Sequence, residues 1–370
     1  MEKAKILIVG AGPVGCVLAE RFANELQVPV QLIDKRSHIA GNCFDRHHES
    51  GVLIHQYGPH YFRTNDESLV QFLSQFTEWI PGNYFVTSFY NSQYFPFPIN
   101  LLTLAQFFGK ESLTPEEAEL LLEEKREKID NPKNSEEFVL SRVGREMYEA
   151  FYLGYTVKQW DMHPKELSTS VCGRIPIRLN TDCRYVDHAF QLTPKDGFTA
   201  MFTKMTTHPL IDIQLNTDYK TISEKPAILI YTGPIDEYFN YCYGKLAWRS
   251  LSFDFKEYPE EFRQPNVQIN YSNDFDFTRT VEIKHVTKQE HPHTVISYEY
   301  PQAEGDPYYP IPTNENHELY LKYKALADKE TAENNVYFCG RLAEYKYFNT
   351  DEVIVNALHT FETIKKKHGN

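Results

Sequence analysis

The chain has 370 residues, of which 41% are hydrophobic, and it carries a formal net charge of −13. This length allows two or three domains, and this hydrophobic content supports packed cores rather than global disorder. The acidic balance, with no long run of lysine and arginine, argues against nucleic acids and anionic membrane surfaces as partners. No stretch approaches ~18 uninterrupted apolar residues, so we expect no membrane span.

Cysteine usage and the N-terminus predict a cytoplasmic protein. No cysteine forms a C-x-x-C pair beside a matching cluster of histidines or cysteines, so zinc is not indicated and no metal site is predicted. We expect free thiols in a reducing compartment. The apolar run near the N-terminus is interrupted by glycines and followed by Glu20 and Arg21, unlike a signal peptide. The six cysteines are Cys16, Cys43, Cys172, Cys183, Cys242 and Cys339.

The first fifty residues predict a dinucleotide-binding βαβ unit. Residues 5–9 form a short β-branched run, and the motif Gly10-x-Gly12-x-x-Gly15 follows at once. A helical pattern over residues 16–26 and a second apolar run over 30–33 complete the unit. The glycines permit the tight turn, the approach of a pyrophosphate and close helix–strand packing, while the helix N-terminus attracts the phosphates. Asp34, which ends the second run, can accept hydrogen bonds from a ribose diol.

The residues after Asp34 favour FAD over NAD as the dinucleotide. Lys35 and Arg36 follow the acid directly, and Gly41-Asn42 comes some residues later. An acid, a basic residue and then Gly-Asn resemble the second FAD contact of the glutathione-reductase-like flavoproteins. Simple dehydrogenases do not usually carry this pattern.

The rest of the chain changes character twice. Residues 101–169 read as helical, with a capping box from Thr114 to Glu117 and a second helix that Ser135 can cap. Alternating runs at 267–271, 279–283 and 294–300 predict antiparallel strands. Buried runs at 227–233 and 336–341 look like strands returning to the nucleotide domain, and residues 353–364 predict a last amphipathic helix.

This order predicts an α/β protein with a discontinuous Rossmann-like FAD-binding domain, an inserted helical bundle and an antiparallel β-sheet domain. The FAD-binding domain is assigned to residues 1–82, 195–238 and 315–370. The sheet domain is assigned to residues 83–100, 171–194 and 239–314, and the helical domain to residues 101–170.

Two groups of side chains are candidates for chemistry. Tyr155 and Trp160 could stack on a nucleotide base, although packing in an aromatic core explains them as well. The four arginines at 174, 178, 184 and 279 could bind a pyrophosphate, or could pair on the surface with the excess carboxylates. No Ser-His-Asp order, nucleophile elbow or P-loop is present, which shifts any chemistry to the flavin.

These stretches together resemble bacterial UDP-galactopyranose mutases along nearly the whole chain. The resemblance is most specific in Tyr231-Thr232-Gly233-Pro234-Ile235-Asp236 and in the stretch from Gly340 to Tyr347. The other matching stretches lie at residues 10–15, 34–42, 57–60, 154–160, 174–178 and 307–310.

The resemblance implies a flavin-dependent mutase that interconverts UDP-galactopyranose and UDP-galactofuranose. In the family, N5 of reduced FAD attacks the anomeric carbon and expels the nucleotide diphosphate, and the adduct opens and recloses as the other ring without net redox change. The resemblance also implies a homodimer and a mobile segment near residues 174–184 that closes over the nucleotide. It leaves NAD(P)H open as an external reductant.

The resemblance assigns three sets of residues in this chain. The catalytic set is His60, Arg174 and Arg279. The substrate set is Asn83, Phe151, Tyr155, Thr156, Trp160, Arg174, Tyr185, Asn270, Arg279, Glu299, Tyr309 and Tyr347. The cofactor set is Gly10, Gly12, Pro13, Val14, Gly15, Asp34, Lys35, Gly41, Asn42, Tyr57, His60, Arg341 and Asn349.

The chain departs from the family pattern near the flavin and the sugar. Arg63 replaces a histidine, Asn349 replaces an aspartate and Asp34 stands where glutamate is usual, while residues 194–198 replace a Pro-x-Gly-Gly-Tyr pattern. The same chemistry on another nucleotide sugar, such as a deoxy or N-acetyl sugar, is therefore an alternative. An FAD-dependent oxidase and a non-catalytic binding protein are two others.

Overall fold

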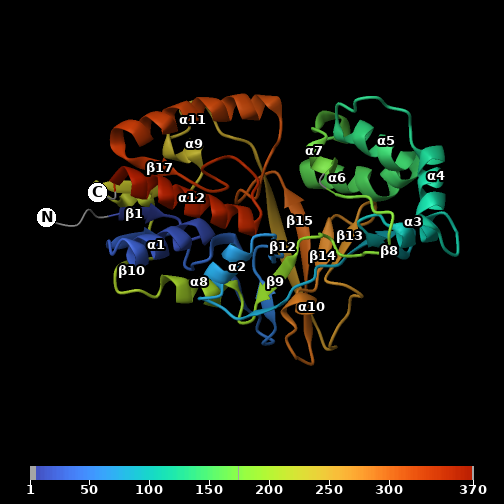
Figure 1. The fold of residues 1–370 in the computed structure, drawn as a ribbon, viewed down its shortest axis with the longest axis horizontal. Coiled ribbons are helices and arrows are strands. Elements are labelled where there is room, and N and C mark those ends of the chain that lie inside the picture. The colour runs from blue at the N-terminus through green and yellow to red at the C-terminus, as the bar shows by residue number, and fades with distance from the viewer. Residues whose placement is uncertain (1–5, 174, 369–370) are drawn as a thin grey trace.

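A computed structural model describes residues 6–173 and 175–368 of the chain. Figure 1 shows a parallel sheet with helices on both faces, a second and larger sheet beside it, and a group of helices above the outer end of that larger sheet. The predicted α/β class and the Rossmann-like part of the fold are confirmed.

The parallel sheet has five strands in the order β10-β2-β1-β11-β17. All four neighbouring pairs run parallel, and the strands are short and mostly buried, as expected when both faces are covered. The strands come from three separate parts of the chain, as predicted. They are β1 (Ile6–Val9), β2 (Val30–Ile33), β10 (Ile211–Gln214), β11 (Ile228–Tyr231) and β17 (Val336–Phe338).

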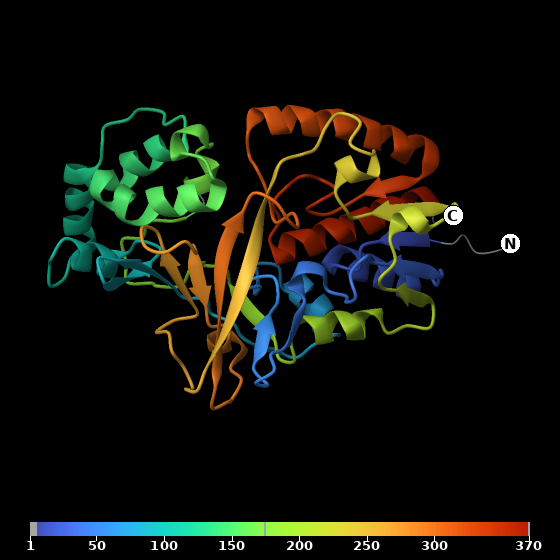
Figure 2. The ribbon, with the colours of Figure 1, turned by 180° about the vertical axis from the view of Figure 1, so that it is seen from behind.

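Helices cover the two faces of this sheet. The buried residues of α1, α8 and α12 form one apolar cluster with strand side chains such as Ile6 and Ile8. On the other face Leu7 and Leu229 pack under Tyr219 and Tyr238. Figure 2 shows α11 as the outermost helix of this domain. The helices are α1 (Pro13–Glu25), α8 (Phe198–Thr206), α9 (Ile235–Tyr238), α11 (Asn314–Asn334) and α12 (Thr350–His368).

The larger sheet has seven strands in the order β16-β12-β15-β14-β13-β7-β8. Every neighbouring pair is antiparallel except β13 and β7, which run parallel. The sheet is therefore mixed, because β7 and β8 form a hairpin from a distant segment that joins the edge at β13. The strands are β7 (Val86–Tyr90), β8 (Gln93–Phe97), β12 (Trp248–Tyr258), β13 (Gln268–Tyr271), β14 (Arg279–Val281), β15 (Thr294–Gln302) and β16 (Tyr309–Pro310).

Short elements connect the two large sheets. One small sheet pairs two strands, and another has the order β5-β9-β6. Their strands are β3 (Asp45–His47), β4 (Leu53–His55), β5 (Phe62–Thr64), β6 (Trp79–Pro81) and β9 (Phe190–Pro194), and the helices near them are α2 (Glu67–Leu73) and α10 (Lys284–Thr287).

The helical unit corrects one predicted cap. The capping box of Thr114 and Glu117 is present, but the helix that follows is capped by Asn134, whose side chain accepts a hydrogen bond from the Glu137 amide. Ser135 is the first helical residue instead, and its hydroxyl donates to the Ser168 carbonyl. The helices are α3 (Leu101–Phe107), α4 (Pro115–Lys125), α5 (Ser135–Tyr148), a π-helical turn (Glu149–Leu153), α6 (Gly154–Trp160) and α7 (Ser170–Gly173).

No described helix is both long enough and apolar enough to cross a membrane. The residue limits of the three predicted domains stay a prediction.

Candidate active site

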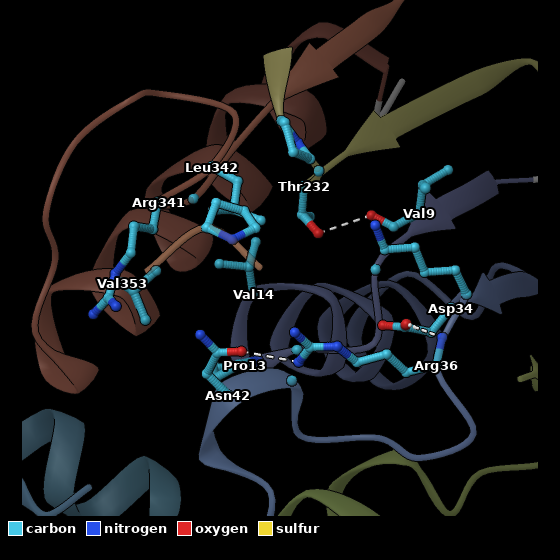
Figure 3. Close-up of a pocket in the computed structure, with 18 of the residues that line it drawn as sticks. Val9, Pro13, Val14, Asp34, Arg36, Asn42, Thr232, Arg341, Leu342 and Val353 are labelled. Atoms are coloured by element: carbon cyan, nitrogen blue, oxygen red, sulfur yellow. Dashed lines mark hydrogen bonds between the residues drawn. The ribbon is translucent and has the colours of Figure 1, made fainter. Parts of the chain in front are cut away.

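A long pocket opens at the carboxyl ends of β1, β2 and β11, where ligands bind in open α/β sheets. Figure 3 shows side chains from the glycine motif, from the end of β2 and from the chain near Arg341 converging on it. Most of the predicted cofactor residues line this one pocket. They are Gly10, Gly12, Pro13, Val14, Asp34, Lys35, Gly41, Asn42, His60, Arg341 and Asn349.

The glycines of the pocket have separate roles. Gly10 has φ +104°, and a Cβ there would lie 2.0 Å from Thr232 Oγ1. A Cβ on Gly15 would lie 1.9 Å from the Gly10 carbonyl oxygen, so Gly15 serves helix–strand packing and does not line the pocket. Gly12 differs from both, since a Cβ there would meet nothing closer than the Gly41 Cα at 3.7 Å. Of these three glycines, only Gly12 could carry a Cβ without a clash inside the protein.

The N-terminus of α1 is suited to an anion. Pro13 occupies its first turn, no acidic residue is present there, and the N-cap residue Gly12 offers no side-chain cap. The positive end of the helix dipole therefore faces the pocket without a carboxylate to neutralise it. A phosphate group would find this charge and the free amide groups together.

Asp34 is nearly buried at the end of β2. Its Oδ2 accepts from the Ala11 amide at 2.7 Å and its Oδ1 from the Arg36 amide at 2.8 Å. Each oxygen keeps a further lone pair for a ribose hydroxyl. Arg36 crosses the pocket to Asn42 Oδ1 at 2.9 Å and Asp306 Oδ2 at 2.8 Å (Figure 3 shows the first contact). Tyr57 lies outside the pocket lining, under the Arg36 guanidinium at 4.5 Å.

The pocket lining also contains residues that the sequence did not assign. The segment after β10 contributes Thr217, Asp218 and Tyr219, which belong to no recognisable sequence motif. Others lie in stretches that carried the family resemblance without having been given a role. These are Tyr231, Thr232, Gly233, Pro234, Pro307, Gly340 and Leu342.

His60 enters the pocket as a neutral side chain. Its Nδ1 lies 3.0 Å from the Gly58 carbonyl, which makes Nδ1 the protonated nitrogen and leaves the Nε2 lone pair free to accept. Burial lowers the pKa of His60 to about 3. The His60 amide donates to Nδ1 of His55 at 3.0 Å, and burial lowers the pKa of His55 to about 4. Both imidazoles are therefore uncharged at neutral pH.

We expect the protein to lose stability as the pH falls below 6.5. The unfolded chain takes up protons on both histidines near that ordinary pKa, whereas the folded chain resists protonation to about pH 4 at His55 and about pH 3 at His60. The lowering at His55 alone corresponds to on the order of 3 kcal/mol at pH 4. Urea unfolding between pH 4.5 and 7.5 measures this, and His55→Gln should flatten the dependence. An equally steep dependence in that variant would contradict the assignment.

A second cluster of side chains lies on the larger sheet. Arg279 of β14 donates from Nε to Glu299 Oε2 of β15 at 2.7 Å. Its Nη2 lies 3.5 Å from the Tyr309 hydroxyl. The ring of Tyr309 stacks on Tyr347 with centroids 5.9 Å apart, and meets Trp160 of α6 edge-on at 6.2 Å. Strands β14 and β16 and helix α6 thus bring these predicted substrate residues together.

Burial sets the charges of this cluster. Burial disfavours the charged form of Arg279, but the Glu299 carboxylate and the surrounding tyrosines together outweigh this and raise the pKa, so the guanidinium stays charged. Burial raises the pKa of Tyr155, a neighbour of Arg279 and Tyr309, to about 12, and it keeps this phenol neutral. Glu299 Oε1 is buried without a hydrogen-bond partner in the described part of the chain. A cation, neutral phenols and one free acceptor are suited to a phosphorylated, hydroxylated ligand.

The two sites are continuous. Arg341 lines the long pocket, and its guanidinium lies 4.6 Å from the ring centroid of Tyr347. Glu299 Oε1 lies 3.5 Å from where a Cβ of Gly58 would be, beside the turn that carries His60. A ligand on the Arg279 cluster therefore adjoins the His60 and Arg341 end of the pocket.

Several predicted substrate residues lie apart from this cluster. The Phe151 ring packs in the core against Phe95, with centroids 5.4 Å apart, and the Thr156 hydroxyl contacts Cys172 Sγ at 3.8 Å inside the helical unit. Their side chains face the core. Asn83 is exposed, and the Tyr185 ring packs near Tyr84. Asn270, by contrast, lies next to the cluster, since it is paired in register with Arg279. Arg174 lies outside the described residues.

Two of the departures from the family pattern, Arg63 and Asn349, contact each other. Arg63 of β5 donates from Nη2 to Asn349 Oδ1 at 2.7 Å and from Nη1 to the Tyr61 hydroxyl at 2.8 Å. Asn349 in turn donates to Glu352 Oε2 at 2.8 Å in the first turn of α12. Asn349 lines the pocket. These two departures from the family pattern therefore alter the pocket wall at a single position, near its His60 end.

The chain is similar to known proteins along nearly its whole length. The family model for UDP-galactopyranose mutase matches residues 150–347, and that for the NAD(P)-binding Rossmann-like domain matches residues 8–76. The chain is 39% identical to a probable UDP-galactopyranose mutase from Klebsiella pneumoniae, over 97% of this chain and 94% of that protein. It is 34% identical to a dTDP-fucopyranose mutase from Escherichia coli, over 96% of each.

Solved structures show a similar fold. The crystal structure of a reduced UDP-galactopyranose mutase matches with a TM-score of 0.79 and 15% identity, over 100% of this chain and 95% of that chain. A putative protoporphyrinogen oxidase from Exiguobacterium matches with a TM-score of 0.69 and 12% identity, over the full length of both. At these identities the likeness concerns the fold alone.

Proposed function

Because the chain belongs to the UDP-galactopyranose mutase family, we propose that it interconverts the pyranose and furanose forms of a UDP-linked galactose with the help of reduced FAD. As a member of this family the chain is an isomerase. The observation that carries the finer proposal is the continuity of the two sites, since Arg341 connects the dinucleotide pocket with the Tyr347–Tyr309–Arg279 cluster.

The pocket residues fit FAD. The α1 N-terminus and Gly12 would hold the pyrophosphate, and Asp34 would accept from the ribose of the adenosine half. Arg341, His60 and Asn349 would then lie toward the flavin half, next to the tyrosine cluster. Reduced flavin supplies a nucleophilic ring nitrogen and undergoes no net redox change over the cycle. The protein contributes position, charge and exclusion of water.

The Arg279 cluster would hold the nucleotide diphosphate. Arg279 supplies a fixed cation for the leaving pyrophosphate, and the hydroxyls of Tyr309 and Tyr347 add donors. Trp160 and Tyr155 would bind the uridine through their rings. The unpartnered Glu299 Oε1 would accept from a sugar hydroxyl, which keeps the sugar beside the turn that carries His60.

A second candidate is the same reaction on a different nucleotide sugar, such as a deoxy or N-acetyl sugar. The observation that favours it is the Arg63–Asn349 contact, which puts a cation and a neutral amide where the family pattern has a histidine and an aspartate. The dTDP-fucopyranose mutase relative differs from the other relatives in both its base and its sugar.

Product analysis with the reduced holoenzyme separates these candidates. We expect UDP-galactofuranose to be converted, and conversion of UDP-N-acetylgalactofuranose or dTDP-fucofuranose at a higher kcat/KM would favour the second candidate. The double variant Arg63→His, Asn349→Asp should shift the preference toward UDP-galactofuranose if this pair reads the sugar. No conversion of any of the three sugars would refute the mutase assignment. The homodimer, the cytoplasmic location and NAD(P)H as reductant stay predictions.

A further inference from the structure

Lys158 of α6 makes an unusual set of contacts for a surface helix. Its Nζ lies within hydrogen-bond distance of four backbone carbonyl oxygens in the turn between β13 and β14. Among the described residues no carboxylate lies within ion-pair distance of Nζ, and burial lowers the pKa of Lys158 to about 8 against the opposing effect of Asp274 and Asp276 in the same turn. The direct contacts of the ammonium group are thus all with peptide carbonyls, and the two carboxylates act on it from a longer distance. The carbonyls belong to Tyr271, Asp274 (3.0 Å), Phe275 (3.2 Å) and Phe277 (3.2 Å).

Other contacts join the same turn to the preceding helical residues. The Ser272 hydroxyl donates to the Phe151 carbonyl at 3.0 Å, and Asn273 Nδ2 donates to the Ala150 carbonyl at 3.1 Å. Gly154 approaches so closely that a Cβ there would lie 2.2 Å from the Ser272 carbonyl oxygen. The turn therefore contacts the helical residues from Ala150 to Lys158, and Lys158 makes the largest number of hydrogen bonds between the two segments.

The turn leads directly into the proposed diphosphate site. It connects β13, which ends at Tyr271, with β14, which begins at Arg279, and Asn270 faces Arg279 in the β13–β14 register. Helix α6, on its other side, carries Tyr155 and Trp160. Figure 1 shows α6 lying over the ends of β13 and β14. The distance between the base-binding rings and the Arg279 guanidinium thus depends on how the turn sits against α6.

We propose that Lys158 is a positioning residue, which sets the spacing between the base-binding helix and Arg279 so that one nucleotide diphosphate contacts both. This inference depends on the proposed function for one assumption, namely that the ligand is a uridine diphosphate. An ammonium group suits the role because it can satisfy several converging carbonyls at once, which a neutral side chain cannot.

The test compares Lys158→Met with Lys284→Met. Lys284 of α10 is fully buried whereas Lys158 is half-buried, but its Nζ likewise donates to backbone carbonyls, those of Glu261, His291 and His293. It lies at the opposite end of the larger sheet from α6 (Figures 1 and 2). Both variants remove an ammonium from a group of converging carbonyls, so both should lower the melting temperature.

Calorimetric titration of the oxidised holoenzymes with UDP distinguishes them. We expect Lys158→Met to bind UDP about tenfold more weakly and to raise KM by a similar factor, since small misplacements of binding groups have large effects. Lys284→Met should bind UDP as the unmodified chain does. Hydrogen exchange of the amides at residues 271–279 should be faster only in Lys158→Met.

A milder variant keeps the test decisive if Lys158→Met fails to fold. Asn273→Ala removes an exposed contact between the same turn and helix, and should weaken UDP binding about threefold. Unchanged UDP affinity in the folded Lys158 and Asn273 variants would overturn the inference. If the unmodified chain itself does not bind UDP, the proposed function fails instead, and the two failures are therefore distinct.

Discussion

Replacing Arg279 by glutamine is expected to lower kcat/KM by about 10³-fold while FAD stays bound. Arg279 is the cation of the cluster, only 18% exposed, and it contacts Glu299 and Tyr309 together. Its charge would be most important when the diphosphate leaves the sugar, because the negative charge then increases on the oxygens it faces. Glutamine retains hydrogen bonding but not this charge. Steady-state kinetics and the flavin-to-protein ratio measure the two effects separately.

Controls separate this loss from misfolding. Removing one partner of a buried ion pair leaves the other charge unpaired, at a cost of about 3–5 kcal/mol. The double variant Arg279→Gln, Glu299→Gln should recover stability without recovering activity. Arg263→Gln is the matched surface control, since this arginine is 49% exposed in an ion pair with Glu260. Activity within tenfold of the unmodified enzyme in Arg279→Gln would remove this residue from the proposed mechanism.

Replacing Gly12 by alanine is expected to weaken FAD binding by at least about 100-fold without unfolding the apoprotein. Gly12 has φ −75°, which alanine adopts readily, and the added Cβ would meet only the Gly41 Cα at 3.7 Å. The fold therefore tolerates the methyl group. A pyrophosphate at the α1 N-terminus does not, because it must approach this backbone closely.

The neighbouring glycine provides the contrast. In Gly15→Ala the new Cβ would lie 1.9 Å from the Gly10 carbonyl oxygen, so the fold itself should be damaged and little soluble protein obtained. Flavin absorbance per protein and the melting temperature of the apoprotein distinguish these outcomes. If Gly12→Ala retains FAD at normal affinity, the pyrophosphate does not lie at this turn.

The sequence predicted best what is local. Gly10, Gly12, Gly15 and Asp34 belong to one βαβ unit whose turn, helix and strand are fixed within about thirty residues, so their spacing carries the geometry. The cap of α5 shows the limit of such reasoning. Asn134 and Ser135 are both good N-cap residues, so the sequence does not say which of them caps α5. The direction in which the chain enters the helix makes Asn134 the cap.

Features that depend on distant parts of the chain were not predictable in this way. Helix α11 buries only Tyr323 and Ala327 along its length, so its sequence carries almost no amphipathic signal. The parallel contact of β13 with β7 joins segments that no local pattern relates. Arg63 and Asn349 are 286 positions apart in the sequence, where they appeared as two unrelated departures from the family pattern. The structure shows that they form one hydrogen-bonded pair.

Counting products per reduced flavin is the most direct test of the central claim. The holoenzyme would be reduced under anaerobic conditions with one equivalent of dithionite, and excess UDP-galactofuranose would then be added. A mutase should form many equivalents of UDP-galactopyranose from that single reduction, with the flavin still reduced at the end, and the oxidised enzyme should form none. At most one product per electron pair, with reoxidised flavin, would contradict the account and indicate an oxidoreductase.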